Sequence, residues 1–133
     1  MAGWLSMPDH SAEPQFLCLA SDLAETGDAV VFEVVAFGVA RPVQAFAVRY
    51  QGRVVAYLNQ CAHVPTEMDW QPGKFWDMDR RFFICSIHGA LYDPPNGLCV
   101  SGPCRGAHLQ KIAVQEIDQK VYWYPSEQFQ PVF

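Results

Sequence analysis

The sequence has no long apolar run and little positive charge. No stretch approaches the roughly 18 consecutive apolar residues of a membrane-spanning helix, and residues 1–15 show no basic segment followed by an apolar run, as a signal peptide would. Lys and Arg number 9 against 14 Asp and Glu, for a net charge of −5. This balance disfavours binding to nucleic acid, whose phosphates require clustered cations. We therefore expect a cytoplasmic protein with no membrane and no nucleic-acid partner.

The sequence also lacks long helical patterns, internal repeats, glycine-rich phosphate loops and pairs of nucleophile and base. It has 133 residues, of which half are hydrophobic, so one domain with a true core is expected. The 5 cysteines show no spacing typical of a small secreted domain held by disulfides.

Short apolar runs between turn residues predict an all-β fold. The predicted strands are 16–19, 29–35, 43–50, 53–58, 82–84, 90–92, 109–117 and 120–124. Tight hairpin turns are expected at Gln51-Gly52 and at Asp118-Gln119. We expect residues 1–14 to form an N-terminal tail and residues 15–133 to form the domain.

Two short motifs follow predicted strands, Cys61-Ala62-His63 and Cys85-Ser86-Ile87-His88. Zinc ribbons and fingers favour segments that each supply two like ligands, whereas each motif here supplies one thiolate and one imidazole. Mixed pairs suit a centre with two chemically different irons, which is the ligand set of a Rieske [2Fe–2S] centre. A tetrahedral zinc site made by the same four side chains is the alternative, and structural thiols with surface histidines are the ordinary interpretation.

The order of motifs resembles the small Rieske ferredoxins. The pattern C-x-H, then C-x2-H-G, is followed by Tyr92-Asp93 and Ser101-Gly102-Pro103, and the resemblance spans roughly residues 16–125. It implies an antiparallel β-sandwich of two stacked sheets, with a small cluster-binding subdomain inserted at one end, about 60–107. One departure is the segment 64–84, which is longer than the usual gap between the motifs.

The resemblance implies one [2Fe–2S] cluster with four protein ligands. Cys61 and Cys85 would hold the inner iron, whereas His63 and His88 would hold the outer iron near the protein surface.

Further residues match positions around the cluster in this family. Tyr92 matches a tyrosine that donates a hydrogen bond to a ligand cysteine, and Gly102 and Pro103 match a loop that covers the cluster. Thr66 and Ile87 occupy the positions of two cysteines that form a disulfide in the Rieske proteins of cytochrome bc complexes.

The same proteins place a serine, which bonds to a cluster sulfide, where this chain has Ala90. Fewer donors to sulfur stabilise the reduced cluster less, so we expect a low-to-middle potential within the Rieske range of about −150 to +300 mV.

The function implied by the resemblance is electron transfer and not catalysis. We expect a one-electron carrier that links a flavin-dependent reductase to a terminal oxygenase or similar oxidoreductase. Alternatives are the Rieske-like small subunit of a nitrite reductase, and a zinc-bound interaction module with no redox role. His10 and His108 have no ligand-like neighbours, so nothing predicts the mononuclear iron site of an oxygenase.

The segment between the motifs is rich in aromatic residues, Trp70, Phe75 and Trp76. We expect them to form a small core under a long loop, and an exposed docking edge beside His63 is the alternative.

Three cysteines are left over, Cys18, Cys99 and Cys104. Cys18 is expected to be a small buried hydrophobic residue, and Cys104 is expected to fill space in the same way, although it follows the Gly-Pro loop and could lie close to the cluster. A bridge between Cys99 and Cys104 is conceivable, but it is not expected in a reducing compartment.

Overall fold

The computed structural model describes residues 13–62 and 66–132, and its regular structure there is almost entirely β. One 3-10 turn, η2 (Ala20–Asp22), is present, and no helix among the described residues is long and apolar enough to cross a bilayer. The strands are β1 (Gln15–Leu19), β2 (Val30–Ala36), β3 (Val43–Tyr50), β4 (Arg53–Leu58), β5 (Phe83–Ile84), β6 (Leu91–Tyr92), β7 (Cys99–Ser101), β8 (Lys111–Ile112), β9 (Val114–Ile117), β10 (Lys120–Trp123) and β11 (Phe129–Gln130). The predicted all-β class is confirmed.

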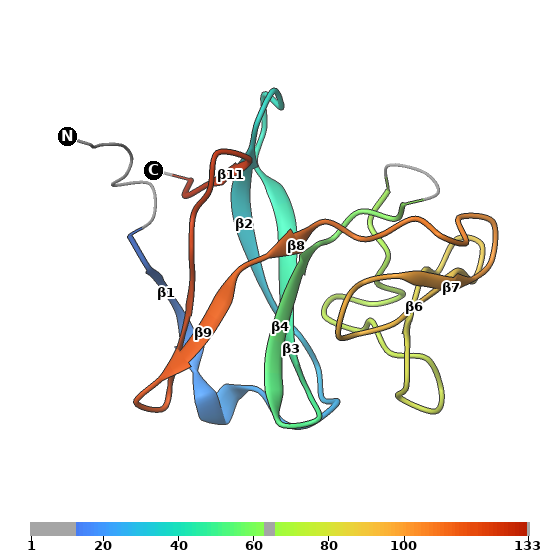
Figure 1. Ribbon diagram of the computed structural model, residues 1–133, viewed down its shortest axis with the longest axis horizontal. Helices are drawn as coiled ribbons and strands as arrows, with labels where there is room; N and C mark the ends of the chain where they lie inside the picture. The colour runs from blue at the N-terminus through green and yellow to red at the C-terminus, as the bar shows by residue number, and fades with distance from the viewer. Residues whose placement is uncertain (1–12, 63–65, 133) are drawn as a thin grey trace.

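The strands form three antiparallel sheets. One has the order β1-β10-β9, the second has the order β11-β2-β3-β4-β8, and the third is the small sheet β5-β6-β7. The first two sheets share a buried core, to which Cys18 and Val121 contribute from one sheet and Val34 and Ala47 from the other. Figure 1 shows the small sheet and its loops on the opposite side of the β2-β3-β4 layer from β1 and β9.

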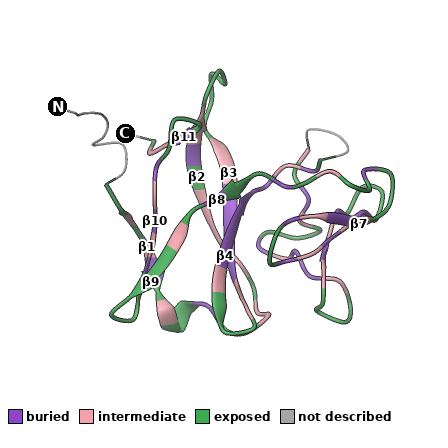
Figure 2. Cartoon of the chain, in the orientation of Figure 1, coloured by how far each residue is buried: buried purple, intermediate pink, exposed green. Residues whose placement is uncertain are grey.

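The central strands β3 and β4 are buried on both faces (Figure 2). Side chains alternate along a strand, so Ala45 and Ala47 enter the core of the sandwich while Phe46 and Val48 enter a second core. This second core also contains most of the buried side chains of residues 60–107. On β3, small residues therefore face the partner sheet, and larger ones face the unit of residues 60–107.

Aromatic rings connect that unit to the sandwich. The ring of Phe46 on β3 stacks on Phe75 with centroids 3.8 Å apart and an interplanar angle of 11°. Phe83 on β5 meets Phe46 edge to face at 5.2 Å, and it meets Tyr57 on β4 in the same way at 5.8 Å. Each such pair contributes about 0.5–1.5 kcal/mol beyond its buried area, so these contacts fix the unit on the sheet.

The predicted strands 43–50 and 53–58 and both tight turns are confirmed. The strands β3 and β4 have the predicted bounds, and the turn residues Gln51 (φ 52°), Gly52 (φ 78°), Asp118 (φ 52°) and Gln119 (φ 66°) are all left-handed. Two consecutive left-handed residues match the twist of the strands that they connect.

The predicted strand 109–117 is two strands in the structure. The first, β8, pairs with β4 in the five-stranded sheet, and the second, β9, pairs with β10 in the three-stranded sheet. The chain changes sheets at Ala113, between the two strands. An apolar pattern does not reveal such a crossing, because it does not show with which neighbouring strand each half pairs.

We predict that Phe75→Ala destabilises the protein by about 3–5 kcal/mol, because it removes a fully buried ring from the stack on Phe46 and leaves a cavity. Denaturant unfolding measures the change. The matched control is Phe37→Ala, since that ring is 85% exposed and its loss should alter stability by less than about 0.5 kcal/mol. Equal stability of the two variants would contradict the packing described for Phe75.

Candidate metal centre

The first motif lies in the loop that leaves β4. Cys61 is 4% exposed, and its backbone N–H donates to the carbonyl of Thr66 over 2.8 Å, which closes the loop around the motif. His63 lies outside the described residues, so its role as a ligand stays a prediction.

Asn59 and Met68 close the same loop further out. Asn59 is a buried polar residue, 4% exposed, and its Oδ1 accepts a hydrogen bond from the backbone N–H of Met68 over 2.8 Å. Its Nδ2 donates to Oδ1 of Asp69 over 3.0 Å. The carbonyl of Met68 in turn accepts the N–H of Ser86 over 3.0 Å. Met68 thus joins the first loop to the second, so that the two motifs are held side by side.

The second motif lies in the tight connection between β5 and β6. Cys85 directly follows β5 and is 1% exposed. Its N–H donates to the carbonyl of Ala90 and its carbonyl accepts the N–H of Gly89, both over 2.9 Å. Gly89 has a φ of 71°, a conformation that glycine adopts without strain. His88 is exposed in the same connection, so a buried sulfur and an exposed imidazole stand on one loop.

The side chains of Cys85 and Cys61 are in hydrogen-bonding contact. Burial raises the pKa of the Cys85 thiol, the backbone N–H groups of Ile87 and then His88 lower it, and the neighbouring Cys61 raises it. Two buried thiolates in such contact repel each other unless a cation lies between them. Metal ions displace the protons of such a pair, so this donor set fits an iron bound by both sulfurs.

Tyr92 supplies a hydroxyl to this sulfur pair. Its Oη lies 3.2 Å from Sγ of Cys61 and accepts the backbone N–H of Ala62 over 2.9 Å. A second sulfur, Sγ of Cys104, lies 3.1 Å from the same oxygen. Burial raises the pKa of Tyr92, and hydrogen bonding to Cys104 raises it further. The phenol therefore keeps its proton and can donate it to one of the two sulfurs.

The Gly-Pro loop packs on the second motif. Gly102 has a φ of 103°, and a Cβ at this position would lie only 2.9 Å from Cα of the buried Ala90. Glycine is thus required for two reasons, its backbone angle and its close approach to Ala90. Pro103 is exposed next to it, so one side of the loop faces solvent while Gly102 packs on Ala90.

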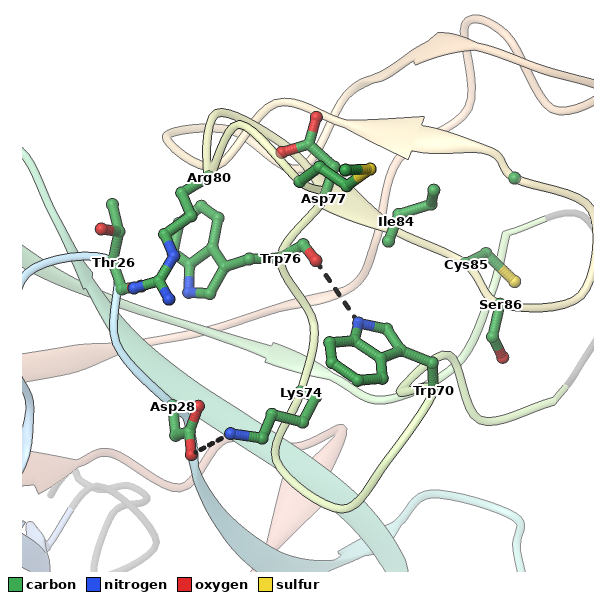
Figure 3. Close-up of a pocket in the computed structure, with 12 residues that line it drawn as sticks. Thr26, Asp28, Trp70, Lys74, Trp76, Asp77, Arg80, Ile84, Cys85 and Ser86 are labelled. Carbon is green, nitrogen blue, oxygen red and sulfur yellow. Dashed lines mark hydrogen bonds and ion pairs between the residues drawn. The ribbon is translucent and has the colours of Figure 1, made fainter.

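The long segment between the motifs forms a small aromatic core. Phe75 is fully buried and Trp76 is 8% exposed, and the indole N–H of Trp76 donates to the carbonyl of Gly27 over 2.9 Å. The expected packing role is confirmed for these two rings. Trp70 is 51% exposed. It lines a cavity of about 510 Å³ that extends to Cys85 (Figure 3).

The structure brings together Cys61, Cys85 and Tyr92, and it places His88 on the same loop as Cys85. In the described ranges 13–62 and 66–132, no three Cys, His, Asp or Glu side chains converge as they would around one metal ion. A Rieske centre does not require this, because each of its irons has only two protein ligands. His108 is exposed, and His10 lies outside the described residues.

Sequence reasoning missed two features of the site. One is the Asn59–Met68 connection, whose only signal is a polar residue directly after an apolar strand. The other is the contact of Cys104 with Tyr92. No sequence signal indicates it, because the two residues meet only in the folded chain.

The described chain is all-β, and the side chains of Cys61 and Cys85, from two separate loops, are in contact. The family model of the Rieske [2Fe-2S] domain matches residues 13–122. The chain is therefore a member of the Rieske [2Fe–2S] family. No match to a curated protein sequence was found.

Solved structures show the same fold. The ferredoxin of carbazole 1,9a-dioxygenase from Nocardioides aromaticivorans IC177 is 18% identical with a TM-score of 0.61, and the match covers 85% of this chain and 98% of that one. A chain in the complex of reduced oxygenase and oxidized ferredoxin of carbazole 1,9a-dioxygenase is 20% identical, with a TM-score of 0.62 and coverage of 84% and 92%. The terminal oxygenase of carbazole 1,9a-dioxygenase from Novosphingobium sp. KA1 is 20% identical with a TM-score of 0.63. That match covers 92% of this chain but only 32% of the oxygenase.

We predict that Gly102→Ala destabilises the protein by at least about 2 kcal/mol, from the left-handed backbone and from the clash with Ala90. Gly106→Ala is the matched control in the same loop, because its φ is also positive, at 94°, but no atom lies within 4 Å of the added Cβ. Thermal unfolding of both variants separates the cost of the left-handed backbone, which both share, from the cost of the clash with Ala90, which only Gly102→Ala has. If Gly106→Ala were the more harmful change, the close packing of Gly102 on Ala90 would be wrong.

Proposed function

We propose that this protein is a one-electron carrier whose redox group is a [2Fe–2S] cluster held by Cys61, His63, Cys85 and His88. The observation that carries the proposal is the contact of two buried cysteine side chains from separate loops, with an exposed histidine on one of those loops. When bound, the cluster supplies reversible one-electron chemistry. Cys61 and Cys85 would hold the inner iron, and His63 and His88 would hold the outer one.

The surrounding residues bind, orient and shield this group. The N–H groups of Ile87 and His88 bond to the Cys85 sulfur, and the hydroxyl of Tyr92 lies at the Cys61 sulfur. Such donors stabilise negative charge on sulfur and so favour the reduced state. The loop at Gly102 would keep water from the inner side of the cluster, where Cys61 and Cys85 hold the iron. We expect a low-to-middle Rieske potential, because Ala90 supplies no further donor.

The exposed position of His88 supports an exchange of electrons with a docked partner. Its neighbours Ser86 and Ile87 are exposed too, so a partner can approach this edge without rearrangement of the core. The complex of oxygenase and ferredoxin in carbazole 1,9a-dioxygenase supports a terminal oxygenase as the acceptor. A flavin-dependent reductase is the donor that we propose. The chain itself would then be a component of an oxidoreductase system and not an enzyme.

The test is the metal content and redox activity of the purified protein. We expect about two irons and two acid-labile sulfides per chain, an EPR signal that appears on reduction, and reduction by a flavin-dependent reductase. Cys61→Ser and Cys85→Ser should abolish the cluster, whereas Cys18→Ser should retain it, because Cys18 lies in the other core. A colourless protein with one zinc ion would overturn the proposal in favour of an interaction module.

We predict that Tyr92→Phe lowers the midpoint potential. The variant loses one hydrogen bond to the Cys61 sulfur, and a net loss of about 1 kcal/mol corresponds to roughly 40 mV for a one-electron couple. Redox titration followed by EPR measures the shift. Tyr124→Phe is the control, since that hydroxyl bonds to Gln115 on the sandwich and its loss should leave the potential unchanged. A potential that does not fall in Tyr92→Phe would contradict the donor role of Tyr92.

A further inference from the structure

Two cysteines outside the proposed ligand set lie against each other beside the cluster site. Sγ of Cys99, at the start of β7, is 2.8 Å from Sγ of Cys104, at the end of the Gly-Pro loop. Ordinary contacts between non-bonded heavy atoms lie near 3.5–4.0 Å, and the sulfurs of a disulfide are about 2.05 Å apart. All five cysteines are described, and none is in a disulfide in this structure. The pair is therefore a dithiol whose sulfurs need little movement to form a bond.

The backbone holds this pair in place independently of the sulfurs. The N–H of Cys99 donates to the carbonyl of Ala107 over 2.8 Å, and the N–H of Gly106 returns to the carbonyl of Cys99 over 3.0 Å. The N–H of Ala107 also donates to the carbonyl of Cys104 over 2.8 Å. A disulfide forms with little strain only where the backbone already brings the two side chains together, and here the two sulfurs are 2.8 Å apart on this frame.

The pair also brackets the loop that packs on the second motif. Gly102 lies between the two cysteines and rests on Ala90, and Sγ of Cys104 contacts the hydroxyl of Tyr92. A bond from Cys99 to Cys104 would close a small ring across this loop. It would not use Cys61 or Cys85, so the cluster ligands would be preserved.

We propose that Cys99 and Cys104 form a reversible disulfide that fixes the Gly-Pro loop over the cluster site. The oxidant is a small-molecule disulfide of the glutathione class. The Cys104 thiolate attacks one sulfur of that disulfide, which gives a mixed disulfide and releases one small thiol. The Cys99 thiolate then attacks the Cys104 sulfur, which releases the second small thiol and forms the protein bridge. In total, two protein thiols are oxidised and one small disulfide is reduced to two thiols.

The order of attack follows from the surroundings of the two thiols. Cys104 is 8% exposed and Cys99 is 1% exposed, so a small disulfide reaches Cys104 first. Burial, together with the hydrogen bond to Cys104, raises the pKa of the Cys99 thiol to about 11. A thiol with so high a pKa is a poor first nucleophile at neutral pH. After the mixed disulfide has formed, Cys99 lies next to the sulfur that it must attack.

The first experiment equilibrates the intact protein anaerobically with mixtures of glutathione and glutathione disulfide. The samples are then quenched with acid, denatured and alkylated, and the masses are measured. We expect a species that is alkylated on three cysteines and not on five, and whose mass after subtraction of the alkyl groups is 2 Da below that of the reduced chain. We also expect a peptide linked through Cys99 and Cys104, and full reversal by dithiothreitol. Cys18→Ser should behave in the same way. Cys99→Ser and Cys104→Ser should lose the lighter species.

Iron and sulfide are measured in the same samples, so failure of this proposal is distinguished from failure of the proposed function. The disulfide proposal is overturned if all five cysteines remain alkylated in the most oxidising mixture. It is also overturned if Cys104 stops at the glutathione adduct, or if the linked pair is Cys61 and Cys85 with loss of iron. The mapping on the unaltered protein gives this result even if a serine variant fails to fold.

A second measurement tests the effect on the loop. Loss of the visible absorbance of the cluster is followed in an iron chelator, for the oxidised and the reduced forms of the Cys99–Cys104 pair. We expect a severalfold slower loss in the oxidised form, because the bridge restricts the opening of the loop. Glutathione disulfide should not change the rate in Cys99→Ser. Equal rates for both forms of the unaltered protein would overturn the role in fixing the loop.

Discussion

Burial of strands β3 and β4 on both faces is the constraint on which the rest of the structure depends. Ala45 on one face allows the three-stranded sheet to approach closely, and Phe46 on the other receives the rings of Phe75 and Phe83. The first cysteine–histidine loop leaves the end of β4 directly, and the second is held by β5, which belongs to the same core. One pair of strands therefore sets the position of both loops.

The parts of the fold that the sequence predicts are those with strong local patterns. The strands β3 and β4 and their turn at Gln51-Gly52 combine β-branched and aromatic residues with a clear turn signal. The strands β7 and β11 carry no such signal. They have three and two residues and exist because a neighbouring strand offers free backbone groups. The change of sheets at Ala113 was missed for the same reason, since it depends on which partners lie nearby.

The candidate site, like the fold, has parts that could be predicted from the sequence and parts that could not. The spacing of Cys61 and Cys85 in two mixed motifs predicted the donor types, and the family resemblance supplied the role of Tyr92, whose hydroxyl lies at the Cys61 sulfur. The contacts that hold the loops together could not be predicted. They join residues far apart in the sequence, such as Met68 with Ser86, or they depend on side-chain directions, as in the contact of Cys99 with Cys104.

The closure of the first loop by Asn59 also explains how the chain accommodates its unusually long segment between the motifs. The ring from Asn59 to Met68 is complete before the additional residues begin. These residues first return to the second core at Phe75 and Trp76. They end in a hairpin in which Asp77 pairs with Phe82 and Met78 is fully exposed. Natural length variation, or a peptide grafted by design, can therefore be accommodated at that tip while the geometry of the ligands is conserved.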